Sequence, residues 1–241
     1  MTRIGIDTGG TFTDFVIVDE KGGITTWKEP STPDDPARAI LTGLRRAAVA
    51  LWGAEVIHGS TVATNALLTD GTARIAFVTN RGFEDLLEIG RQARPDLYNL
   101  NVKRPAPLAP RDLRFGITGR ILHDGSVHEP ILPEEIARLA ADLRESGVEA
   151  VALCLLHSYA DNSHEEAVAR QLAAAGLPVS SSSRLVNEYR EYERASTCAV
   201  NAAVGPVVSR YLNRLEAGLG SDGVKNLRVM GSNGGALSPA A

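Results

Sequence analysis

The chain has 241 residues, of which 44% are hydrophobic and 22% charged, and its formal net charge at pH 7 is −4. This composition describes a globular protein with room for one large domain or two small ones, and its slight acidity disfavours a general surface for nucleic acid or anionic membrane. No apolar run reaches the roughly 20 residues that span a bilayer. The N-terminus lacks a signal-peptide pattern because Asp7 and Asp14 interrupt its apolar part.

The cysteine pattern points to a reducing compartment. Cys154 and Cys198 lie in the apolar stretches ALCLL and STCAV, and neither has metal-ligand spacing to a second cysteine. Free cysteines in such surroundings are typically packed in the core. Together with the missing signal, this pattern predicts a cytoplasmic protein whose cysteines serve only in packing.

The N-terminal part of the chain predicts three strands and a helix. Ile4–Glu20 is predicted to form two strands around a glycine-containing turn, because its second half, Phe12–Val18, is rich in β-branched and aromatic residues. Ile24–Lys28 is the predicted third strand. A helix is then expected to open at Pro33–Pro36 and to end at Gly53.

Strands and helices alternate in the rest of the chain, which predicts an α/β fold with a mixed sheet flanked by helices. The nearly continuous apolar stretch 148–156 is typical of a strand that is covered on both sides. Ser163 and Glu166 have the spacing of a capping box at a helix start. The other predicted elements are strands at 55–58, 74–79, 179–182 and 227–230 and helices at 62–68, 83–90, 133–147, 163–176 and 187–219.

Three stretches depart from this alternation. Residues 91–115 contain four prolines and predict an extended excursion. Segments 117–122 and 126–131 flank Asp124-Gly125, which is a hairpin signal. Gly205-Pro206 falls within the long helical stretch and should break or kink it.

The stretch GIDTGGTFTD joins the two opening strands and suits a phosphate. It is neither a P-loop, which needs Lys-Ser/Thr after its last glycine, nor a dinucleotide fingerprint, whose glycines open a helix. Gly9 and Gly10 carry no Cβ and let backbone N–H groups approach an anion, while Thr11 and Thr13 add hydroxyl groups. Asp7 would hold Mg²⁺ through water beside such a phosphate. The alternative is a plain hairpin, although a tight hairpin needs fewer turn residues.

The same stretch resembles the first phosphate motif of the superfamily that contains actin, the sugar kinases and the heat-shock ATPases. Further segments, taken in order with it, make the chain similar to the hydantoinase A / 5-oxoprolinase family, whose members open amide rings with ATP. These segments are HGSTVATNALL at 58–68, VTNRGFEDLLEIGRQ at 78–92, ALCLLHSY at 152–159, EYERAS at 191–196 and GSNGG at 231–235. The resemblance therefore covers essentially the whole chain.

The resemblance implies an actin-like ATPase lobe, with residues 1–183 as a hydantoinase/oxoprolinase N-terminal domain and 184–241 as the start of the ATPase domain. It implies ATP and Mg²⁺ as cofactors, phosphorylation of a cyclic amide carbonyl, and a hydantoinase B-type partner subunit or domain. Because the superfamily's ATP site lies between two lobes, this chain alone is expected to bind nucleotide weakly. The alternatives are the beta-type subunit of an ATP-dependent acetone or acetophenone carboxylase and a non-catalytic nucleotide-binding module.

The expected site residues fall into three sets. The catalytic set is Asp7, His58 and Arg91, and the substrate-binding set is Thr61, Asn65 and Arg94. Asp7 is also the expected metal ligand. The cofactor-binding set is Asp7, Thr8, Gly9, Gly10, Thr11, Thr13, Ser232, Asn233, Gly234 and Gly235.

Several of these assignments have a structural alternative. Thr61 is of an N-cap type, so its segment can equally cap a helix and hold a hydrogen-bonded histidine. Arg91 and Arg94 can belong to a solvated loop, and 188–194 is interpreted as a charged helix face. A metal site is a further interpretation, with His157, Asp161, His164 and Glu165 as the ligands. The preference of helix starts for acidic residues weighs against it.

Overall fold

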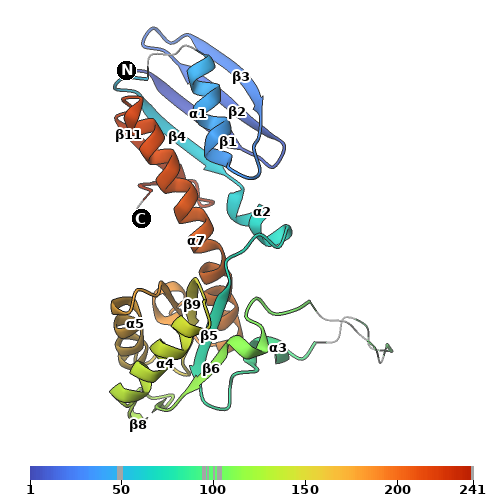
Figure 1. Cartoon of the computed structure of the whole chain (residues 1–241), viewed down its shortest axis with the longest axis vertical. Helices are drawn as coiled ribbons and strands as arrows, with labels where there is room; N and C mark the ends of the chain where they lie inside the picture. The colour runs from blue at the N-terminus through green and yellow to red at the C-terminus, as the bar shows by residue number, and fades with distance from the viewer. Residues whose placement is uncertain (48–50, 94–95, 97, 100, 102–104, 240–241) are drawn as a thin grey trace. The chain divides into compact units, whose positions relative to one another are not determined.

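The computed structural model describes residues 1–47, 51–93, 96, 98, 99, 101 and 105–239. They divide into two compact units, each with its own sheet (Figure 1). Unit 1 is formed by Met1–Gly71 and Val207–Ala241, and unit 2 by the intervening Thr72–Pro206. Unit 2 is therefore an insertion into the chain of unit 1, and helix α7 (Glu191–Ser221) contributes to both.

Unit 1 is built on a mixed sheet with the strand order β12-β11-β4-β1-β2-β3. Strand β1 pairs antiparallel with β2, to which a short turn connects it, and parallel with β4 on its other side. The sheet continues with β3 antiparallel to β2 and with β11 parallel to β4. The strands are β1 (Arg3–Thr8), β2 (Phe12–Val18), β3 (Ile24–Pro30), β4 (Glu55–Ser60), β11 (Asn226–Met230) and β12 (Ala236–Leu237).

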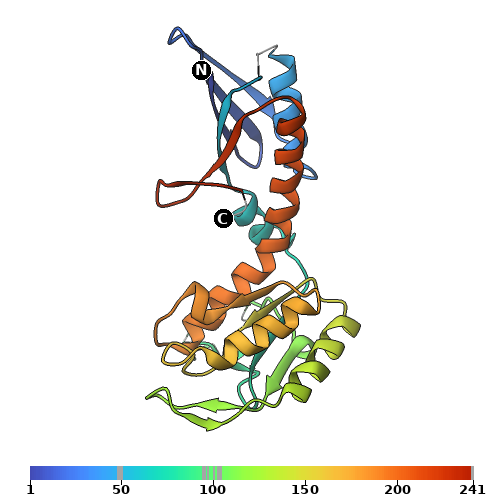
Figure 2. The ribbon, with the colours of Figure 1, turned by 90° about the vertical axis from the view of Figure 1, so that its left-hand side faces the viewer.

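One face of this sheet packs against α1 (Pro36–Arg46) and the C-terminal part of α7, which lie on the same side of it (Figure 2). Side chains alternate between the faces of a strand, so Ile4 and Ile6 of β1 and Phe15 and Ile17 of β2 all face these helices. The helical side of this core includes Ala37, Ile40, Leu44, Tyr211, Leu212, Leu215 and Leu219.

Unit 2 contains a parallel sheet in the order β10-β9-β5-β6. Strand β5 is buried along its whole length because helices cover both faces of the sheet. Alternate residues of β5 and β9 pack either against α4 and α5 or against the first part of α7. These elements are β5 (Ile75–Asn80), β6 (Arg114–Ile117), β9 (Ala150–Leu153), β10 (Val179–Ser181), α4 (Pro133–Glu145) and α5 (Ser163–Ala174).

Shorter elements complete the described fold. In unit 1, α2 (Val62–Leu68) follows β4 with the predicted bounds. In unit 2 the short elements are α3 (Leu86–Ile89), η1 (Arg111–Leu113), β7 (Arg120–Ile121), β8 (Val127–Glu129) and α6 (Ser182–Leu185). The predicted α/β class with a mixed sheet flanked by helices is confirmed. Cys154 and Cys198 are buried and unpaired, as predicted.

Some predicted boundaries are wrong because tertiary pairing decides them. The predicted strand 117–122 is divided: Ile117 ends β6, whereas Arg120 begins β7, and Gly119 turns the chain between them at φ +97°. Helix α1 ends at Arg46 rather than at Gly53, and 48–50 lie outside the described residues. The helix predicted at 83–90 is only the four-residue α3.

Two local helix signals also fail. Of the break or kink predicted at Gly205-Pro206, the break is wrong, because α7 continues through Pro206, and the kink stays a prediction. Proline removes one backbone N–H from the helix, and packing of α7 in the cores on either side of that position compensates for the loss. The predicted capping box does not form, since α5 starts at Ser163 without a side-chain cap and the Glu166 carboxylate binds Arg184.

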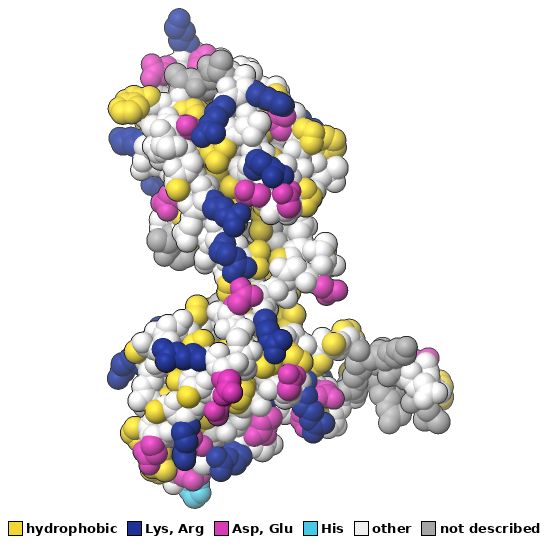
Figure 3. All heavy atoms as spheres, in the orientation of Figure 1, with side chains coloured by type: hydrophobic (Ala, Val, Ile, Leu, Met, Phe, Trp, Pro, Cys, Tyr) yellow, Lys and Arg dark blue, Asp and Glu magenta, His cyan; other side chains and the backbone are white. Residues whose placement is uncertain are grey.

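Figure 3 shows the charged side chains on one face of the molecule. Acidic and basic side chains are mixed over the described part of both units on the face shown in Figure 3, so neither sign of charge dominates that face. Among the described residues, every helix is too short or too polar to cross a membrane.

Candidate functional site

The glycine turn, residues 9–11, joins β1 to β2 and is held by the end of β3. Gly9 N–H donates to the Phe12 carbonyl at 3.0 Å, which closes the turn. Ser31 donates its N–H to the Thr11 carbonyl at 2.9 Å and its hydroxyl to the Gly9 carbonyl at 2.8 Å. The Thr13 hydroxyl lies 3.0 Å from that of Ser31 and is fully buried. The turn is therefore fixed from the β3 side before any ligand binds.

Only some of the residues predicted to bind phosphate still have an unused hydrogen-bond donor. The N–H groups of Gly10 and Thr11 make no hydrogen bond within the described part of the chain, and both residues are exposed. By contrast, the N–H of Gly9 is already used, and the side chains of Thr8 and Thr13 are buried. An anion at this turn would therefore be received by the Gly10 and Thr11 amides and the Thr11 hydroxyl.

The start of α2 is bonded directly to the glycine turn. Thr61 donates both its N–H and its hydroxyl to the Thr8 carbonyl, each at 3.2 Å. Asn65, one helical turn later, donates its Nδ2 to the Thr61 hydroxyl at 3.3 Å. A Cβ on Gly10 would lie 3.4 Å from that Nδ2 atom, so the carboxamide lies against the turn. The structure thus brings the predicted substrate residues Thr61 and Asn65 next to the predicted phosphate turn.

Asp7 lies on the opposite face of the sheet from the helices. Because residues alternate along β1, Thr8 faces the core while Asp7 is exposed. Asp14 is its antiparallel neighbour and Gly59 its parallel neighbour. A Cβ on Gly59 would lie 3.2 Å from Asp7 Oδ1, so this glycine leaves the room in which the carboxylate lies.

The Asp7 carboxylate fits a cation that brings its own ligands. The carboxylates of Asp7 and Asp14 lie on directly opposite strand positions and repel each other. The Lys28 ammonium lies 3.1 Å from Asp14 Oδ1 and therefore offsets the charge of Asp14 alone. Mg²⁺ is typically held by one or two carboxylates together with waters and substrate phosphates. No group of three or more His, Cys, Asp or Glu side chains converges on a metal position among the described residues. Asp7 therefore suits a phosphate-bound Mg²⁺ better than a bare ion.

His58 is fully buried beneath this site. Its Nδ1 donates to the Ile6 carbonyl at 3.3 Å, and its Nε2 accepts the Tyr211 hydroxyl. Burial lowers the pKa of His58 from 6.5 to about 4, although the Ile6 carbonyl and Asp7 oppose the shift. Burial raises the pKa of Tyr211, so its hydroxyl stays protonated and donates. The neutral imidazole faces the core, and we assign it a positioning role for β1 and α7.

A cavity of about 600 Å³ lies in unit 1 on the helix side of the glycine turn. It is bounded by the turn, the β3–α1 loop, α2 and one face of α7. Asp7 and Thr61 do not line it. The lining residues are Thr8, Gly9, Gly10, Thr11, Ser31, Thr32, Pro33, Asp34, Asp35, Pro36, Val62, Asn65, Ala66, Thr69, Gly71, Val207, Arg210, Tyr211 and Arg214.

The second predicted glycine segment, Ser232–Gly235, forms the exposed turn between β11 and β12. Strand β11 is parallel to β4, which is parallel to β1, so all three strands end at the same edge of the sheet. Neighbouring strands are about 4.8 Å apart, which places this turn about 10 Å across the sheet from the glycine turn. This distance is consistent with the expectation that the glycine turn and the 232–235 turn lie at one edge of the sheet.

The remaining predicted site residues belong to unit 2. Arg91 forms an ion pair with Glu193 and lines a cavity of about 630 Å³ that also contains Tyr192. Its neighbours Gly90 and Gln92 have φ angles of +56° and +57°. Arg94 lies outside the described residues.

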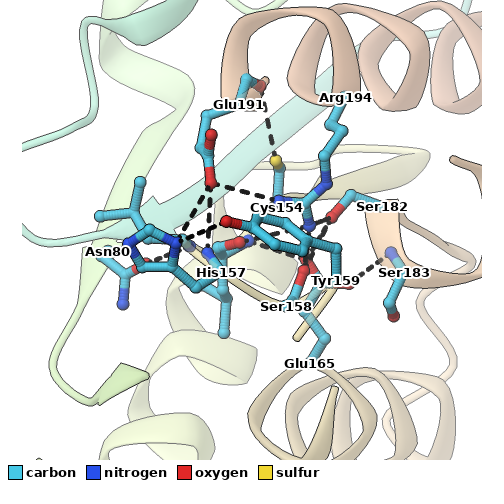
Figure 4. A network of polar contacts seen from close by, with 12 residues as sticks. Asn80, Cys154, His157, Ser158, Tyr159, Glu165, Ser182, Ser183, Glu191 and Arg194 are labelled. Atoms are coloured by element: carbon cyan, nitrogen blue, oxygen red, sulfur yellow. Dashed lines mark hydrogen bonds and ion pairs between the residues drawn. The ribbon is translucent and has the colours of Figure 1, made fainter. Parts of the chain in front are cut away.

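A buried polar network lies at the carboxyl ends of β9 and β10 (Figure 4). Arg194 and Glu165 are both fully buried and form an ion pair at 3.6 Å. The carboxylate accepts the Leu155 N–H and the Ser158 hydroxyl at 2.8 Å each and the Ser182 hydroxyl at 2.5 Å. The interpretation of 188–194 as a charged helix face is therefore wrong for Arg194. Glu165 is committed to this network and not to a metal.

The fold of unit 1, with its glycine turn between the first two strands, defines the class of the chain as an actin-like ATPase lobe. Solved structures with similar sequences agree. The chain matches the crystal structure of the ATP-dependent caprolactamase from Pseudomonas jessenii over 97% of its length, with a TM-score of 0.84 and 35% identity. It matches a nucleotide-free structure of acetone carboxylase over 99% of its length, with a TM-score of 0.82 and 27% identity.

Residues 3–176 match the hydantoinase/oxoprolinase N-terminal region, and the chain belongs to the hydantoinase/oxoprolinase family. It is 40% identical to the caprolactamase subunit alpha of Pseudomonas jessenii over 98% of its length, and 30% identical to the 5-oxoprolinase of Saccharomyces cerevisiae over 97%. It spans 36% and 22% of the length of these relatives, and 36% and 37% of the two solved chains. The predicted family is confirmed, and the domain boundary at residue 183 stays a prediction.

The burial of neutral His58 predicts a loss of stability in acid. Above pH 6.5 the ring is neutral in both the folded and the unfolded chain, whereas between pH 6.5 and about 4 only the unfolded chain takes up the proton. The free energy of unfolding should therefore fall as pH falls through this window, by on the order of 3 kcal/mol in full. Urea unfolding between pH 7 and 4.5 should show this dependence weakened in His58→Gln. An equal dependence in both proteins would contradict the assignment.

The buried ion pair predicts an asymmetric response to substitution. Arg194→Met leaves the Glu165 charge buried without its partner and should lower the free energy of unfolding by about 3–5 kcal/mol. The double variant Glu165→Gln/Arg194→Met should recover much of that loss. Arg184→Met is the matched control, because Arg184 pairs with Glu166 at the surface and should cost about 1 kcal/mol or less. Equal effects of Arg194→Met and Arg184→Met in chemical unfolding would show that the network is not buried.

Proposed function

We propose that this chain is the N-terminal, ATP- and Mg²⁺-binding part of an ATP-dependent hydrolase of cyclic amides. The observation that carries the proposal is the glycine turn, fixed through Thr61 and Ser31, with the exposed carboxylate of Asp7 two residues before it. Membership of the hydantoinase/oxoprolinase family supports it, as does the likeness to an ATP-dependent caprolactamase.

In this proposal each part of the site has a defined role. Gly10 and Thr11 receive the terminal phosphates through their backbone N–H groups, and Asp7 holds the accompanying Mg²⁺ through water. Gly59 keeps the space that the Asp7 carboxylate occupies. ATP supplies the phosphoryl group that turns a poor amide electrophile into a reactive one. The contribution of the chain is positioning and charge neutralisation.

A partner subunit or domain belongs to the proposal. The relatives include a protein named as subunit alpha of caprolactamase and one named as the gamma subunit of acetophenone carboxylase. We propose a hydantoinase B-type partner. Buried, unpaired Cys154 and Cys198 support the cytoplasmic location expected from the sequence.

A second candidate is a subunit of an ATP-dependent ketone carboxylase, favoured by the likeness to acetone carboxylase. Both candidates need ATP activation of a carbonyl oxygen, so the same turn and the same Asp7 serve either. A third candidate is a nucleotide-binding module without turnover. A panel of hydantoin, 5-oxoproline, ε-caprolactam and acetone, tested for stimulation of ATP hydrolysis by the full-length gene product, separates the three.

Asp7→Asn should lower substrate-stimulated ATP hydrolysis by the full-length protein at least about 100-fold, because the carboxylate that neutralises the metal–phosphate complex is lost. Its thermal stability should hardly change, since Asp7 is exposed. Asp142→Asn, on the exposed side of α4, is the matched control and should keep activity within about twofold. Full activity of Asp7→Asn at saturating Mg²⁺ would refute the role of Asp7.

A further inference from the structure

We propose that the cavity beside the glycine turn binds the cyclic amide itself, and that the side-chain carboxamide of Asn65 recognises the amide edge of the ring. The inference rests on the proposed function and names the substrate-recognising residue of that site. It places the amide on the helix side of the turn, while Asp7 lies on the other face of the sheet.

Asn65 is held so that part of its carboxamide remains available. Its Nδ2 donates to the Thr61 hydroxyl at 3.3 Å, and Thr61 is in turn bonded to the Thr8 carbonyl. A carboxamide has two N–H donors and one carbonyl acceptor. The second N–H and the Oδ1 atom make no hydrogen bond within the described residues, and Asn65 lines the cavity. One donor and one acceptor of the carboxamide are therefore left without a partner among the described residues.

This pair of groups is complementary to a cyclic amide. An open-chain amide is almost always trans, with its C=O and N–H on opposite sides. A small ring forces the cis form, so C=O and N–H point the same way and can meet one carboxamide in two parallel hydrogen bonds. Asparagine recognises the adenine edge by the same bidentate geometry. Asn65 can thus distinguish a ring amide from a linear peptide.

The charges around the cavity favour an uncharged ring. Both carboxylate oxygens of Asp34 accept from Nη2 of Arg38, and Asp35 lies 3.7 Å from Arg214. These carboxylates are therefore already balanced by arginines. Apolar and aromatic groups from α2 and α7, among them Val62, Ala66, Val207 and Tyr211, complete the walls. The walls thus combine apolar and polar groups, and a cavity of about 600 Å³ has the size of a small-molecule pocket.

The glycine turn is shared between the cavity and the predicted phosphate site. Gly10 and Thr11 line the cavity, and their N–H groups make no hydrogen bond to any residue that the structure describes. An amide held by Asn65 would therefore lie beside a phosphate received by these two residues. Phosphoryl transfer requires that closeness of donor and acceptor.

The test measures binding of two probes to the full-length protein, δ-valerolactam and δ-valerolactone, by ligand-observed NMR. The lactone keeps the ring and the carbonyl but lacks the N–H. Wild type should bind the lactam about fivefold more tightly than the lactone, as expected for one neutral hydrogen bond. Asn65→Leu should weaken lactam binding about tenfold and bring the two probes within about twofold. Asn213→Leu, the same change at an exposed position of α7, should leave both affinities unchanged.

Asn65→Asp provides a second variant if leucine disturbs folding, which thermal melting will show. It is nearly isosteric but lacks the donor for the lactam carbonyl, so lactam binding should weaken by a similar factor. Unchanged lactam affinity in folded Asn65→Leu or Asn65→Asp would overturn the proposal. If these variants lost affinity for ATP but kept their lactam affinity, the proposal would also be overturned, because Asn65 would then bind the adenine base.

Turnover is measured separately, so the two proposals fail in different ways. If no cyclic amide stimulates ATP hydrolysis while lactam binding still depends on Asn65, the proposed lactam pocket is supported and the proposed reaction is refuted. If lactam stimulates ATP hydrolysis and Asn65→Leu leaves the KM for lactam unchanged, the proposed lactam pocket is refuted and the proposed reaction is supported.

Discussion

The glycine turn keeps its place because the Thr8 carbonyl accepts both the N–H and the hydroxyl of Thr61. These bonds join the end of β1 to the start of α2, across the parallel pair of β1 and β4. On the other side, Ser31 fixes the same turn from the end of β3. Because the core of unit 1 holds these strands in place, the turn between them keeps one conformation although it is rich in glycine and threonine. The binding groups are therefore arranged in advance and lose little entropy when a ligand arrives.

The alternation along β1 gives the two faces of the sheet different chemistry. Thr8 and Ile6 face the helices, whereas Asp7 faces outward beside Gly59. The Asp7 carboxylate, which is proposed to hold Mg²⁺, thus lies on the opposite face of the sheet from His58 and Tyr211, which are neutral and bonded to each other. On the helix side, Asn65 and the face of α7 form a cavity whose carboxylates are paired with arginines. One turn therefore separates a charged face from a largely neutral pocket.

Patterns within a few residues were sufficient to predict much of this architecture. The two opening strands and the 62–68 helix follow from local periodicity and turn chemistry, whereas the phosphate role of the glycine turn stays a proposal. The bonds that tie the site together join distant residues: Thr61 to Thr8, and Tyr211 to His58, which is 153 residues away in sequence. Nothing local in the sequence identifies such partners. For the same reason the burial of Arg194 was missed, because its partners Glu165, Ser158 and Ser182 come from other elements. In α7, tertiary packing overrode the break signal of Pro206.

The central claim is that the amides of Gly10 and Thr11 receive the phosphates of Mg·ATP. It is tested most directly by ¹⁵N-labelled NMR of the 25.6 kDa chain during titration with Mg·ADP and with a non-hydrolysable ATP analogue. The account predicts that the amide signals of Gly10 and Thr11 move most, more with the triphosphate analogue than with the diphosphate, while those of the 124–126 hairpin turn stay in place. Saturable shifts elsewhere, with the turn unchanged, would contradict it.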